Sequence, residues 1–521
     1  MYSHDLIQQP FGLLTDLIEC HAREQPHKIA LVDEQRTITF FNLNQKINQF
    51  ANRLLEEHLP PQSVIAICAL NSIEYVIAFF GSLKAGMAIA PLAPSSSVLG
   101  ITGMLNNAQA RFIFTDESTS ELIHLAKDEQ KAKRISMSSA SFEEWLSTNK
   151  ESVSIPIEAH WPFNLIYSSG TTGDPKGIVQ PHSMRWAHAQ RGLSFNYNQQ
   201  SVVLISIPLY SNTTLVCFLP GIALGGTIVM MKKFNVLDFL KLSQEHRTTH
   251  TMLVPVQYQR IMACPEFLEY DLSSYQQKFS TSSPFSAALK QDVLNRWPGN
   301  LTEYYGMTEG GGTLILHASQ FPHKLHTVGQ PASTSDIRLI DEAGNEIAKD
   351  QIGEVVGRSP AMMSEYYREP SKSKSAEWYS KEGLRFIRTG DIGRFDEDGF
   401  LILMDRKKDM IISGGFNIYP SDIEGVLVSH PNVLEAAVVG VKSDQWGESP
   451  VAFVVLHELK SSSQISAEEL LSWTNQQLGK TQRLVDLKIL TALPRSHIGK
   501  VLKRDLRNNW ESHPNTSPLE E

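Results

Sequence analysis

The sequence predicts an α/β fold: a large N-terminal domain of layered α/β sheets with a small β-barrel-like part, followed by a small α+β C-terminal domain. Three observations lead to this prediction. Short β-branched runs alternate with helix-length patterns before Gly329, which is typical of mostly parallel sheets covered by helices. After Gly329 the pattern changes to short strands separated by Gly and Asp, which favours antiparallel pairing. The length of 521 residues exceeds one ordinary core, so two or more domains are expected.

Strand and helix patterns alternate in order along the N-terminal part of the chain. The runs SVIAICAL (63–70) and ARFIFTD (110–116) have strand character, and helix-length patterns follow each of them. Two longer apolar segments are interrupted by Lys, Pro or Gly. A membrane span needs about 20 nearly unbroken apolar residues, so a buried helix–turn–strand unit is the better interpretation. The two segments are YVIAFFGSLKAGMAIAPLA (75–93) and TTLVCFLPGIALGGTIVMM (213–231).

Short antiparallel strands are expected in DIRLIDEAGNEI (336–347) and GEVVGRSP (353–360). A domain boundary is predicted within LILMDRKKDMIISGG, where a strand leads into a charged cluster and a paired-glycine turn. This prediction assigns 1–407 to the N-terminal domain and 408–521 to the C-terminal domain. The latter contains helix and strand patterns such as SDIEGVLVSHPNVLEAAVVGV, which suit a compact small domain.

The composition is typical of a soluble cytoplasmic protein. The chain carries 47 Lys and Arg against 56 Asp and Glu, a formal net charge of −9, so no nucleic-acid partner is expected. Four cysteines lie far apart and never as CxxC, which fits a reducing compartment and excludes a cysteine-rich zinc site. The N-terminal stretch MYSHDLIQQPFGLL lacks the basic and apolar regions of a signal peptide, and no membrane span is predicted.

A loop rich in glycine and hydroxyl residues lies between two strand runs, in LIYSSGTTGDPKGIVQPH (165–182). It is not a Walker A loop, because Pro175 precedes Lys176, the glycine spacing differs, and no helix begins directly after it. Glycines, hydroxyls and one lysine still suit a polyphosphate, while a solvated hairpin turn is the alternative that the residues alone leave open. The candidate phosphate-binding residues before Lys176 are Ser168, Ser169, Gly170, Thr171, Thr172 and Gly173.

The segment YSSGTTGDPKG resembles the phosphate loop of the adenylate-forming superfamily, which includes acyl- and aryl-CoA synthetases, adenylation domains of peptide synthetases and luciferases. Three further motifs of that superfamily follow in order. They are EYYGMTEGG (303–311), RTGDIGRFDEDGFLILMDRKKDMIISGGFNIYPSDIE (388–424) and LPRSHIGKVLKRDLR (493–507). The resemblance extends over nearly the whole chain and favours the AMP-forming acyl-/aryl-CoA synthetase type.

The resemblance implies two half-reactions and a mobile C-terminal domain that changes position between them. A carboxylate attacks ATP to give acyl-AMP and pyrophosphate, and a thiol then displaces AMP. The implied cofactors are ATP, Mg²⁺ and coenzyme A. Because a carboxylate approaches a polyanion in the first step, cations and oriented dipoles are expected to carry most of the catalysis.

The resemblance assigns catalytic roles to four residues. Lys500 would stabilise the charge that develops during adenylation, and Glu309 would hold Mg²⁺, which prefers oxygen ligands. Lys176 and Thr308 would contact the phosphates. Outside this context a lysine in a basic tail, such as Lys500, is more often a solvated surface residue.

Further residues match nucleotide- and CoA-binding positions. Asp391 would accept hydrogen bonds from both ribose hydroxyls, and Arg406 would support the ribose and phosphate side, although a surface ion pair would also explain Arg406. Lys408 matches the interdomain hinge, and Gly414 and Gly415 match the turn along the pantetheine tunnel. The remaining nucleotide-binding assignments are Ser283, Tyr304, Tyr305 and Gly306, with Tyr305 stacking on adenine.

An apolar acyl pocket is expected to begin at IPLYSNTTLVCFLPGIALGG (207–226). The absence of acidic residues there counts against an α-amino acid, and an aromatic or medium-chain aliphatic acid suits the pocket. Ser211 stands where many family members carry a large side chain, and Thr281 and Ser282 make the facing segment more polar than usual. The residues assigned to the substrate are Tyr210, Ser211, Tyr258 and Gly310, with Met252, Val254, Gly311 and Gly312 in the same wall.

Two further groups of residues have open interpretations. Arg185, Trp186 and Arg191 fit either an exposed helix surface or a site for the nucleotide of CoA. Trp446 fits either the CoA side of the site or a buried core. These four residues are therefore not assigned to the site.

The sequence therefore predicts an ATP-dependent carboxylate–CoA ligase that forms an acyl-AMP and then an acyl-CoA. A stand-alone enzyme that loads an acyl carrier protein is the alternative within the same chemistry, and a non-catalytic nucleotide-binding homologue is a third possibility. The third is disfavoured because Lys176, Glu309, Asp391, Arg406 and Lys500 are all present. A monomer and a homodimer fit the sequence equally, and the acid is not specified.

Overall fold

The structure is a computed structural model of the chain. It describes residues 1–34, 36–129, 131–168, 175–406, 409–413, 416–443, 446–457, 465–479, 482–495 and 500–512. The chain divides into two compact units, which are described separately: Met1–Ile337 with Val356–Arg388, and Arg338–Val355 with Thr389–Glu521. The predicted domain boundary between 407 and 408 lies outside the described residues and stays a prediction.

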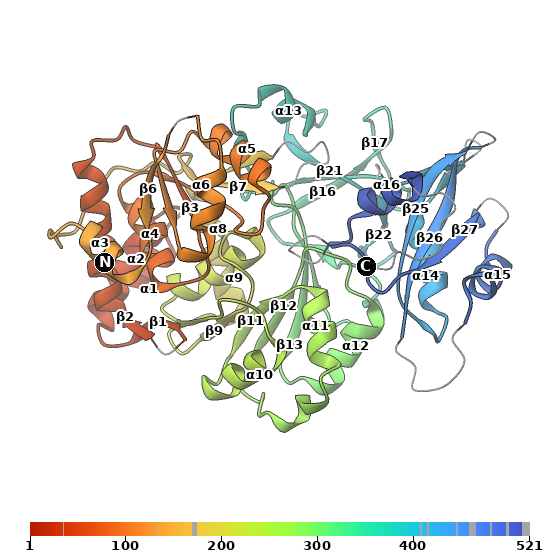
Figure 1. The fold of residues 1–521 in the computed structure, drawn as a ribbon, viewed down its shortest axis with the longest axis horizontal. Helices are drawn as coiled ribbons and strands as arrows, with labels where there is room; N and C mark the ends of the chain where they lie inside the picture. The colour runs from red at the N-terminus through yellow and green to blue at the C-terminus, as the bar shows by residue number, and fades with distance from the viewer. Residues whose placement is uncertain are drawn as a thin grey trace. The chain divides into compact units, whose positions relative to one another are not determined.

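A nine-stranded sheet in the first unit is parallel through its centre. Its strands are β1 (Ile29–Asp33), β2 (Arg36–Thr39), β9 (Val202–Ile205), β10 (Thr227–Met230), β11 (His250–Leu253), β12 (Gln277–Ser280), β13 (Asn300–Tyr305), β14 (Leu314–His317) and β15 (Gln330–Pro331). The order is β15-β14-β13-β12-β11-β9-β10-β1-β2, and every neighbouring pair from β13 to β1 is parallel. Figure 1 labels β1, β2, β9, β11, β12 and β13 of this sheet. The N-terminal hairpin of β1 and β2 thus lies beside β10, far from it in sequence.

A seven-stranded sheet in the same unit is mixed. Its strands are β3 (Val64–Cys68), β4 (Ala88–Pro91), β5 (Phe112–Thr115), β6 (Lys133–Ser136), β7 (Pro162–Ser168), β8 (Lys176–Pro181) and β19 (Glu365–Tyr366), in the order β19-β8-β7-β4-β3-β5-β6. β7 and β8 pair antiparallel, with Ser168 opposite Lys176. This pairing confirms the strand–loop–strand setting predicted for the hydroxyl-rich loop.

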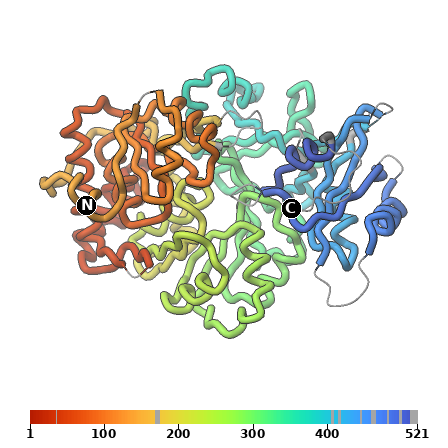
Figure 2. The backbone as a smooth tube through the Cα atoms, viewed as in Figure 1, coloured from red at the N-terminus to blue at the C-terminus, as the bar shows by residue number. Residues whose placement is uncertain are grey.

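Thirteen α-helices and four 3₁₀ helices are described in the first unit. They are α1 (Ser3–Leu6), α2 (Leu14–Glu24), α3 (Phe40–Glu56), α4 (Ile73–Lys84), α5 (Val98–Ala108), α6 (Ser120–Leu125), α7 (Ser139–Trp145), α8 (His182–Arg191), α9 (Asn212–Ala223), α10 (Val236–Glu245), α11 (Pro255–Met262), α12 (Ala287–Arg296), α13 (Pro370–Ser375), η1 (Glu117–Thr119), η2 (Gly192–Phe195), η3 (Pro265–Glu269) and η4 (Pro322–Lys324). The tube in Figure 2 follows this path from the red N-terminal helices to the green strands of the nine-stranded sheet.

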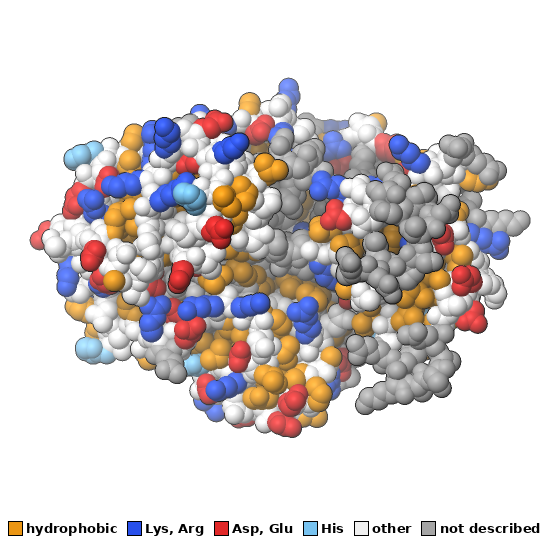
Figure 3. Space-filling view, in the orientation of Figure 1, with side chains coloured by type: hydrophobic (Ala, Val, Ile, Leu, Met, Phe, Trp, Pro, Cys, Tyr) orange, Lys and Arg blue, Asp and Glu red, His pale blue; other side chains and the backbone are white. Residues whose placement is uncertain are grey.

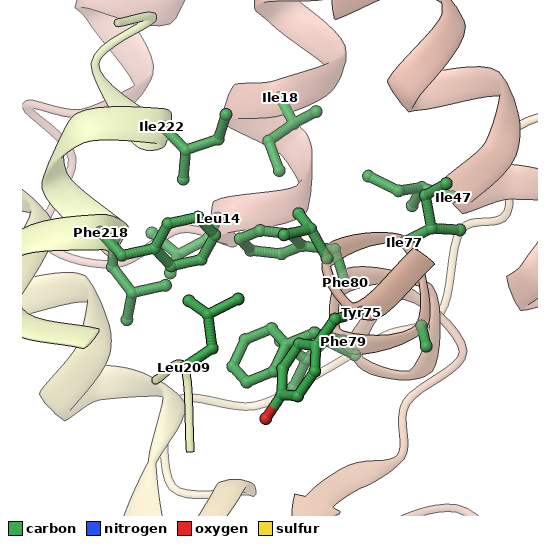
Figure 4. Close-up of a cluster of buried hydrophobic side chains, with 14 of the residues drawn as sticks. Leu14, Ile18, Ile47, Tyr75, Ile77, Phe79, Phe80, Leu209, Phe218 and Ile222 are labelled. Atoms are coloured by element: carbon green, nitrogen blue, oxygen red, sulfur yellow. The ribbon is translucent and has the colours of Figure 1, made fainter. Parts of the chain in front are cut away.

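The two interrupted apolar segments form buried helix–turn–strand units, as predicted. The first is α4 followed by β4, and the second is α9 followed by β10. Every residue of α4 is buried, including Lys84, whose ammonium lies 2.7 Å from the carboxylate of Glu19 on α2. Figure 4 shows Phe79 and Phe80 of α4 with Phe218 and Ile222 of α9 in one hydrophobic cluster. An apolar helix surrounded by protein therefore explains these segments.

Three further features of the described residues concern helix hydrophobicity, surface charge and the cysteines. No helix among them is both long and apolar enough to cross a membrane. Side chains of both charges are interspersed on the face of the first unit that Figure 3 shows. All four cysteines are free, and Cys20, Cys68 and Cys217 are buried. Burial raises the pKa of the Cys68 and Cys217 thiols to about 12.

Short strands after Gly329 pair antiparallel, as predicted. They are β16 (Asp336–Ile340), β17 (Glu346–Ile347), β18 (Gly353–Arg358), β20 (Glu377–Tyr379), β21 (Arg385–Phe395) and β22 (Leu401–Arg406). In the first unit β20 pairs with the beginning of β21. In the second unit β16 pairs with β17, and the end of β21 pairs with β22.

The remainder of the second unit is a sheet with a hydrophobic cluster on each face. Its elements are β23 (Ile411–Ser413), β24 (Phe416–Ile418), α14 (Pro420–Val428), β25 (Val433–Ser443), β26 (Gly447–Leu456), α15 (Ala467–Gln477), β27 (Asp486–Ile489) and α16 (Lys503–Ser512). Along β25, Val438 belongs to one cluster, while Ala437 and Val439 belong to the other. This alternation follows from the two-residue period of a strand, and it fits the small α+β domain predicted for this part of the chain.

Candidate active site

The carboxyl ends of four neighbouring parallel strands gather the segments that hold most of the predicted site residues. β9, β11, β12 and β13 run side by side in one direction, so their carboxyl ends share one edge of the sheet. Ligands of open α/β sheets bind at such edges. The residues that follow these strands are Tyr210 and Ser211 after β9, Tyr258 after β11, Ser283 after β12, and Gly306, Thr308, Glu309 and Gly310 after β13, whose last residues are Tyr304 and Tyr305.

Glu309 occupies a turn that is tied to a distant segment of the first unit. The Tyr366 hydroxyl donates a hydrogen bond of 2.8 Å to Glu309 Oε1, and the Met363 N–H donates one of 2.8 Å to the Glu309 carbonyl. The Lys176 ammonium lies 5.3 Å from the centroid of the Tyr366 ring. Tyr366 thus contacts both Lys176, at the end of the hydroxyl-rich loop, and Glu309.

The Tyr366 hydroxyl keeps its proton at neutral pH and therefore acts as a hydrogen-bond donor. Its side chain is 7% exposed. Burial and the neighbouring Glu309 carboxylate raise the pKa of the Tyr366 hydroxyl, so the phenol stays protonated at neutral pH. A charge-assisted hydrogen bond of this kind orients the carboxylate that accepts it.

The Glu309 carboxylate fits a magnesium ion that is shared with a nucleotide. Tyr366 engages Oε1, and the structure gives Oε2 no partner among the described residues. No cluster of three or more His, Cys, Asp or Glu side chains in the described parts of the chain forms a protein-only metal site. Mg²⁺ is commonly bound by one or two carboxylates together with substrate phosphates, so a single glutamate suits it.

The glycines after Glu309 are required by close backbone packing. Gly310 has a φ of +73°, and a Cβ there would lie 2.1 Å from the Ala361 carbonyl oxygen. Gly311 also has a positive φ, and a Cβ on Gly312 would lie 2.0 Å from Ile337 Cδ1. Positive φ values and backbone contacts explain Gly310 and Gly311, and the Ile337 side chain explains Gly312. The predicted contact with an acyl group stays a prediction.

Thr308 is fixed through its backbone. The buried Gln180 side chain on β8 donates a hydrogen bond of 2.6 Å from Nε2 to the Thr308 carbonyl. The Gln180 Oε1 accepts hydrogen bonds from Asn164 and Arg185. The segment before Glu309 is therefore connected to a polar network inside the first unit.

Arg185 is the centre of that network and is completely buried. Its guanidinium donates to Asn164 Oδ1 at 2.9 Å, to Asn212 Oδ1 at 2.9 Å and to Gln180 Oε1, and it lies 3.2 Å from His188 Nδ1. Desolvation lowers the pKa of Arg185 to about 9, and desolvation together with Arg185 lowers the pKa of His188. The helix-surface interpretation of Arg185 is wrong, because its donors face neutral partners in the interior.

Hydroxyl groups line the segments that were expected to face the acyl group. Thr213 Oγ1 and Ser282 Oγ lie 2.6 Å apart, and Ser282 has a φ of +82°, a strained backbone for a residue with a side chain. Ser211 is buried at the N-cap of α9, and Ser283 is half-buried. These contacts connect α9 to the segment after β12.

The first unit also contains buried aromatic rings and a narrow apolar cavity near β9, β11 and β12. Tyr258 is fully buried and donates a hydrogen bond of 2.9 Å to the Phe279 carbonyl, and Tyr304 stacks on Phe279 with ring centroids 5.5 Å apart. A cavity with an empty volume of about 160 Å³ is too narrow to hold a water molecule. Its lining consists of Leu204, Ile205, Ile207, Thr214, Cys217 and Met252.

In the second unit, Asp391 and Arg406 are paired residues of neighbouring strands. They are Cα partners in the antiparallel pairing of β21 with β22. Asp391 is buried, and its N–H donates a hydrogen bond of 3.0 Å to Thr389 Oγ1. The side chain of Arg406 lies outside the described residues. The two predicted ribose residues are thus brought opposite each other by strand register.

Lys500 precedes a short bridge in the second unit. Its neighbour Val501 pairs with Arg495, and Lys500 itself is partly buried. Trp446 is 50% exposed, so the buried-core interpretation of this tryptophan is wrong. Predicted site residues that lie outside the described residues are Ser169, Gly170, Thr171, Thr172, Gly173, Lys408, Gly414 and Gly415, together with the side chain of Ser168.

Comparison with known proteins gives a family for both parts of the chain. Residues 18–367 match the family of AMP-binding enzymes, and residues 422–500 match the C-terminal domain of AMP-binding enzymes. The first match alone covers more than half of the chain. The motifs discussed above lie within or beside these two regions.

Individual relatives cover nearly the full length of the chain. 4-coumarate–CoA ligase 2 of Nicotiana tabacum is 30% identical over 490 residues, covering 90% of this chain and 89% of the relative. Fatty acid–acyl-carrier-protein ligase ScoC of Streptomyces coeruleorubidus is 28% identical, covering 94% and 95%. The structure of o-succinylbenzoate CoA synthetase MenE from Bacillus subtilis, in complex with its acyl-adenylate intermediate, matches with a TM-score of 0.81 and 27% identity, covering 94% and 97%.

Proposed function

The chain belongs to the family of AMP-binding enzymes, and we propose that this AMP-forming acid–thiol ligase is a carboxylate–CoA ligase acting on an aromatic or medium-chain aliphatic acid. The strongest structural support is the contact of Lys176 and Glu309 with one tyrosine in the first unit. A cation for phosphates and a carboxylate for a divalent metal are the groups that the first half-reaction needs at ATP.

In the first half-reaction the chain supplies charge and orientation. Lys176 and Thr308 bind the phosphates, and Glu309 orients a metal–nucleotide complex. Mg²⁺, when bound, would offset the negative charge of the phosphate oxygens. Asp391 and Arg406 hold the ribose side of the nucleotide, and Lys500 stabilises the charge between the carboxylate and the α-phosphate. Withdrawal of Lys500 with its domain precedes attack by the thiol.

An acid with a flat or short apolar group suits the residues around the proposed acyl site. The segment 207–231 contains no acidic side chain, which disfavours an α-amino acid. Tyr258, Phe279 and Tyr304 place aromatic rings beside the segments that follow β11, β12 and β13. The names of the relatives, a 4-coumarate ligase and an o-succinylbenzoate synthetase, also favour an aromatic acid.

Coenzyme A is the preferred thiol, with a carrier protein as the alternative. The 4-coumarate ligase and the MenE synthetase act with CoA, as their names state, whereas ScoC acts with an acyl carrier protein. The half-exposed Trp446 is available to contact either pantetheine arm. A direct comparison of the two thiols separates these functions.

Carboxylate-dependent exchange of pyrophosphate into ATP tests the proposal. We expect exchange with at least one aromatic or medium-chain acid, followed by AMP release that depends on added CoA. Release with an acyl carrier protein but not with CoA would favour the alternative. An absence of exchange over a broad panel of acids would contradict the ligase function and support a nucleotide-binding homologue.

A further inference from the structure

Tyr366 is a candidate that the motifs did not indicate. We propose that Tyr366 is a positioning residue that controls two groups at once: its hydroxyl orients Glu309 for a metal–nucleotide complex, and its ring holds the Lys176 ammonium until a phosphate takes its place. This inference rests on the proposed function, because it assigns ATP as the ligand of both groups.

Strand register places the tyrosine between these two residues. β19 pairs antiparallel with β8, with Tyr366 opposite Ile178, two positions from Lys176. The Tyr367 N–H donates a hydrogen bond of 2.7 Å to the Gly177 carbonyl and secures this register. The same segment reaches Glu309 through the Met363 N–H. Backbone pairing therefore fixes Tyr366 against both elements.

Packing restricts the movement of the Tyr366 ring. The ring belongs to a buried cluster with Ile178, Met363 and Ile387, and only 7% of the side chain is exposed. A side chain held by packing and by one directed hydrogen bond is the arrangement that preorganises a neighbouring group. Glu309 thus receives its orientation from a part of the core.

The two charged groups keep their charges available for a ligand. Within the described parts of the chain, no ion pair joins Lys176 or Glu309 to an oppositely charged side chain. The face of an aromatic ring attracts an ammonium without neutralising it. A phosphate oxygen attracts the same ammonium more strongly, so Lys176 can exchange the ring for the nucleotide.

The hydroxyl also decides which carboxylate oxygen is left for a cation. A carboxylate has two oxygens with about four acceptor positions in total. Because the Tyr366 hydroxyl occupies Oε1, Oε2 is left for other ligands. Removal of the hydroxyl frees the carboxylate to rotate, and this loss acts on metal-dependent binding of ATP rather than on binding of the acid.

Calorimetric titration of the full chain with ATP, once with Mg²⁺ and once with a chelator, tests this inference without requiring turnover. Loss of a hydrogen bond to a charged group weakens binding about tenfold. For Tyr366→Phe we expect this rise in the Kd of MgATP and no change in the Kd of metal-free ATP. For Tyr366→Leu, which also removes the ring, we expect both constants to rise. Equal changes for both forms of ATP in Tyr366→Phe would overturn the proposal.

Tyr275→Phe is the matched control. Tyr275 is buried, its hydroxyl lies 2.7 Å from Ser243 Oγ, and it precedes the amino end of β12, away from the carboxyl ends that hold the site. We expect both ATP constants to match those of the unmodified protein. An effect of Tyr275→Phe equal to that of Tyr366→Phe would reveal a general consequence of losing a buried hydroxyl and would overturn the assigned role.

A double-mutant cycle with Glu309→Gln provides the second measurement. If the Tyr366 hydroxyl acts through Glu309, then Tyr366→Phe should have no further effect on MgATP binding in the Glu309→Gln background. Additive effects would overturn the proposal even if one variant is less stable. The variants could show the expected pattern of MgATP binding while no acid supports pyrophosphate exchange. That result would refute the proposed ligase function but would support the role of Tyr366.

Discussion

The side chain of Gln180 donates a hydrogen bond of 2.6 Å to the backbone carbonyl of Thr308. The same amide accepts hydrogen bonds from Asn164 and from the buried Arg185. The backbone of Thr308, which is predicted to bind phosphate, is therefore held by a hydrogen-bond network that includes the buried guanidinium of Arg185. Because these groups are desolvated, the network stabilises the fold only while every member keeps its partner.

Arg185→Met is expected to destabilise the first unit strongly. The substitution leaves Asn164 Oδ1 buried without its donor, whereas Gln180 Oε1 and Asn212 Oδ1 each keep one other donor. One uncompensated buried polar group costs about 1–3 kcal/mol, so the free energy of unfolding should fall by roughly that amount. Urea unfolding checks this value. Arg260→Met, at an exposed position on α11, is the control, and an equal change in both variants would contradict the importance of the network.

Buried histidines predict a loss of stability in mild acid. Burial lowers the pKa of His182 and of His250 to about 4. The unfolded chain binds these protons near pH 6.5 and the folded chain only near pH 4, so stability falls as the pH decreases through this window, by up to about 3 kcal/mol for each histidine. Unfolding measured as a function of pH should show a smaller slope for His250→Gln. The exposed His160→Gln should keep the original slope, and an unchanged slope in His250→Gln would refute the assignment.

Two alanine substitutions of glycine should have opposite effects. Gly310→Ala introduces a Cβ 2.1 Å from the Ala361 carbonyl at a φ of +73°, so we expect a loss of about 1–3 kcal/mol. Gly425 lies in α14 with no atom within 4 Å of an added Cβ, so Gly425→Ala should stabilise its unit by about 0.5–1 kcal/mol. Thermal unfolding of both variants measures the difference. Tolerance of alanine at 310 would contradict the close backbone contact.

Lys500→Ala should separate the two half-reactions. The proposed role of this lysine is confined to adenylation, so pyrophosphate exchange should decrease by about 100-fold or more, while thioester formation from supplied acyl-AMP stays within a few-fold of normal. Lys503→Ala removes a nearby lysine that pairs with Glu424 at 2.8 Å and should leave both rates near normal. Equal losses of both half-reactions in Lys500→Ala would contradict the proposal that Lys500 acts only in adenylation.

The sequence predicted the elements whose signals are local. The apolar runs around 75–93 and 213–231 indicated helix–turn–strand units, and the strands that flank the hydroxyl-rich loop were recognisable from their apolar residues. In each case the residues that form the element are neighbours in the chain, so their pattern carries the information.

Contacts between distant segments could not be predicted in this way. Tyr366 meets Glu309 only because β19 adds to the edge of β8, and no residue near Tyr366 in the sequence indicates that pairing. The sequence left two interpretations of Arg185 open, an exposed helix surface and a site for the nucleotide of CoA, and charged residues are mostly exposed. Its neutral partners Asn164 and Asn212 come from β7 and α9, and only the folded chain brings them to it.

The burial of the cysteines has a practical consequence for an enzyme whose proposed substrate is a thiol. Cys68 and Cys217 are buried and have thiol pKa values of about 12, so they are almost entirely protonated at assay pH. Protonated, inaccessible thiols react slowly with disulfide reagents. A chromogenic disulfide such as Ellman's reagent should therefore report the consumption of coenzyme A with little background from these two cysteines, and mixed disulfides between them and oxidised coenzyme A should not accumulate on storage.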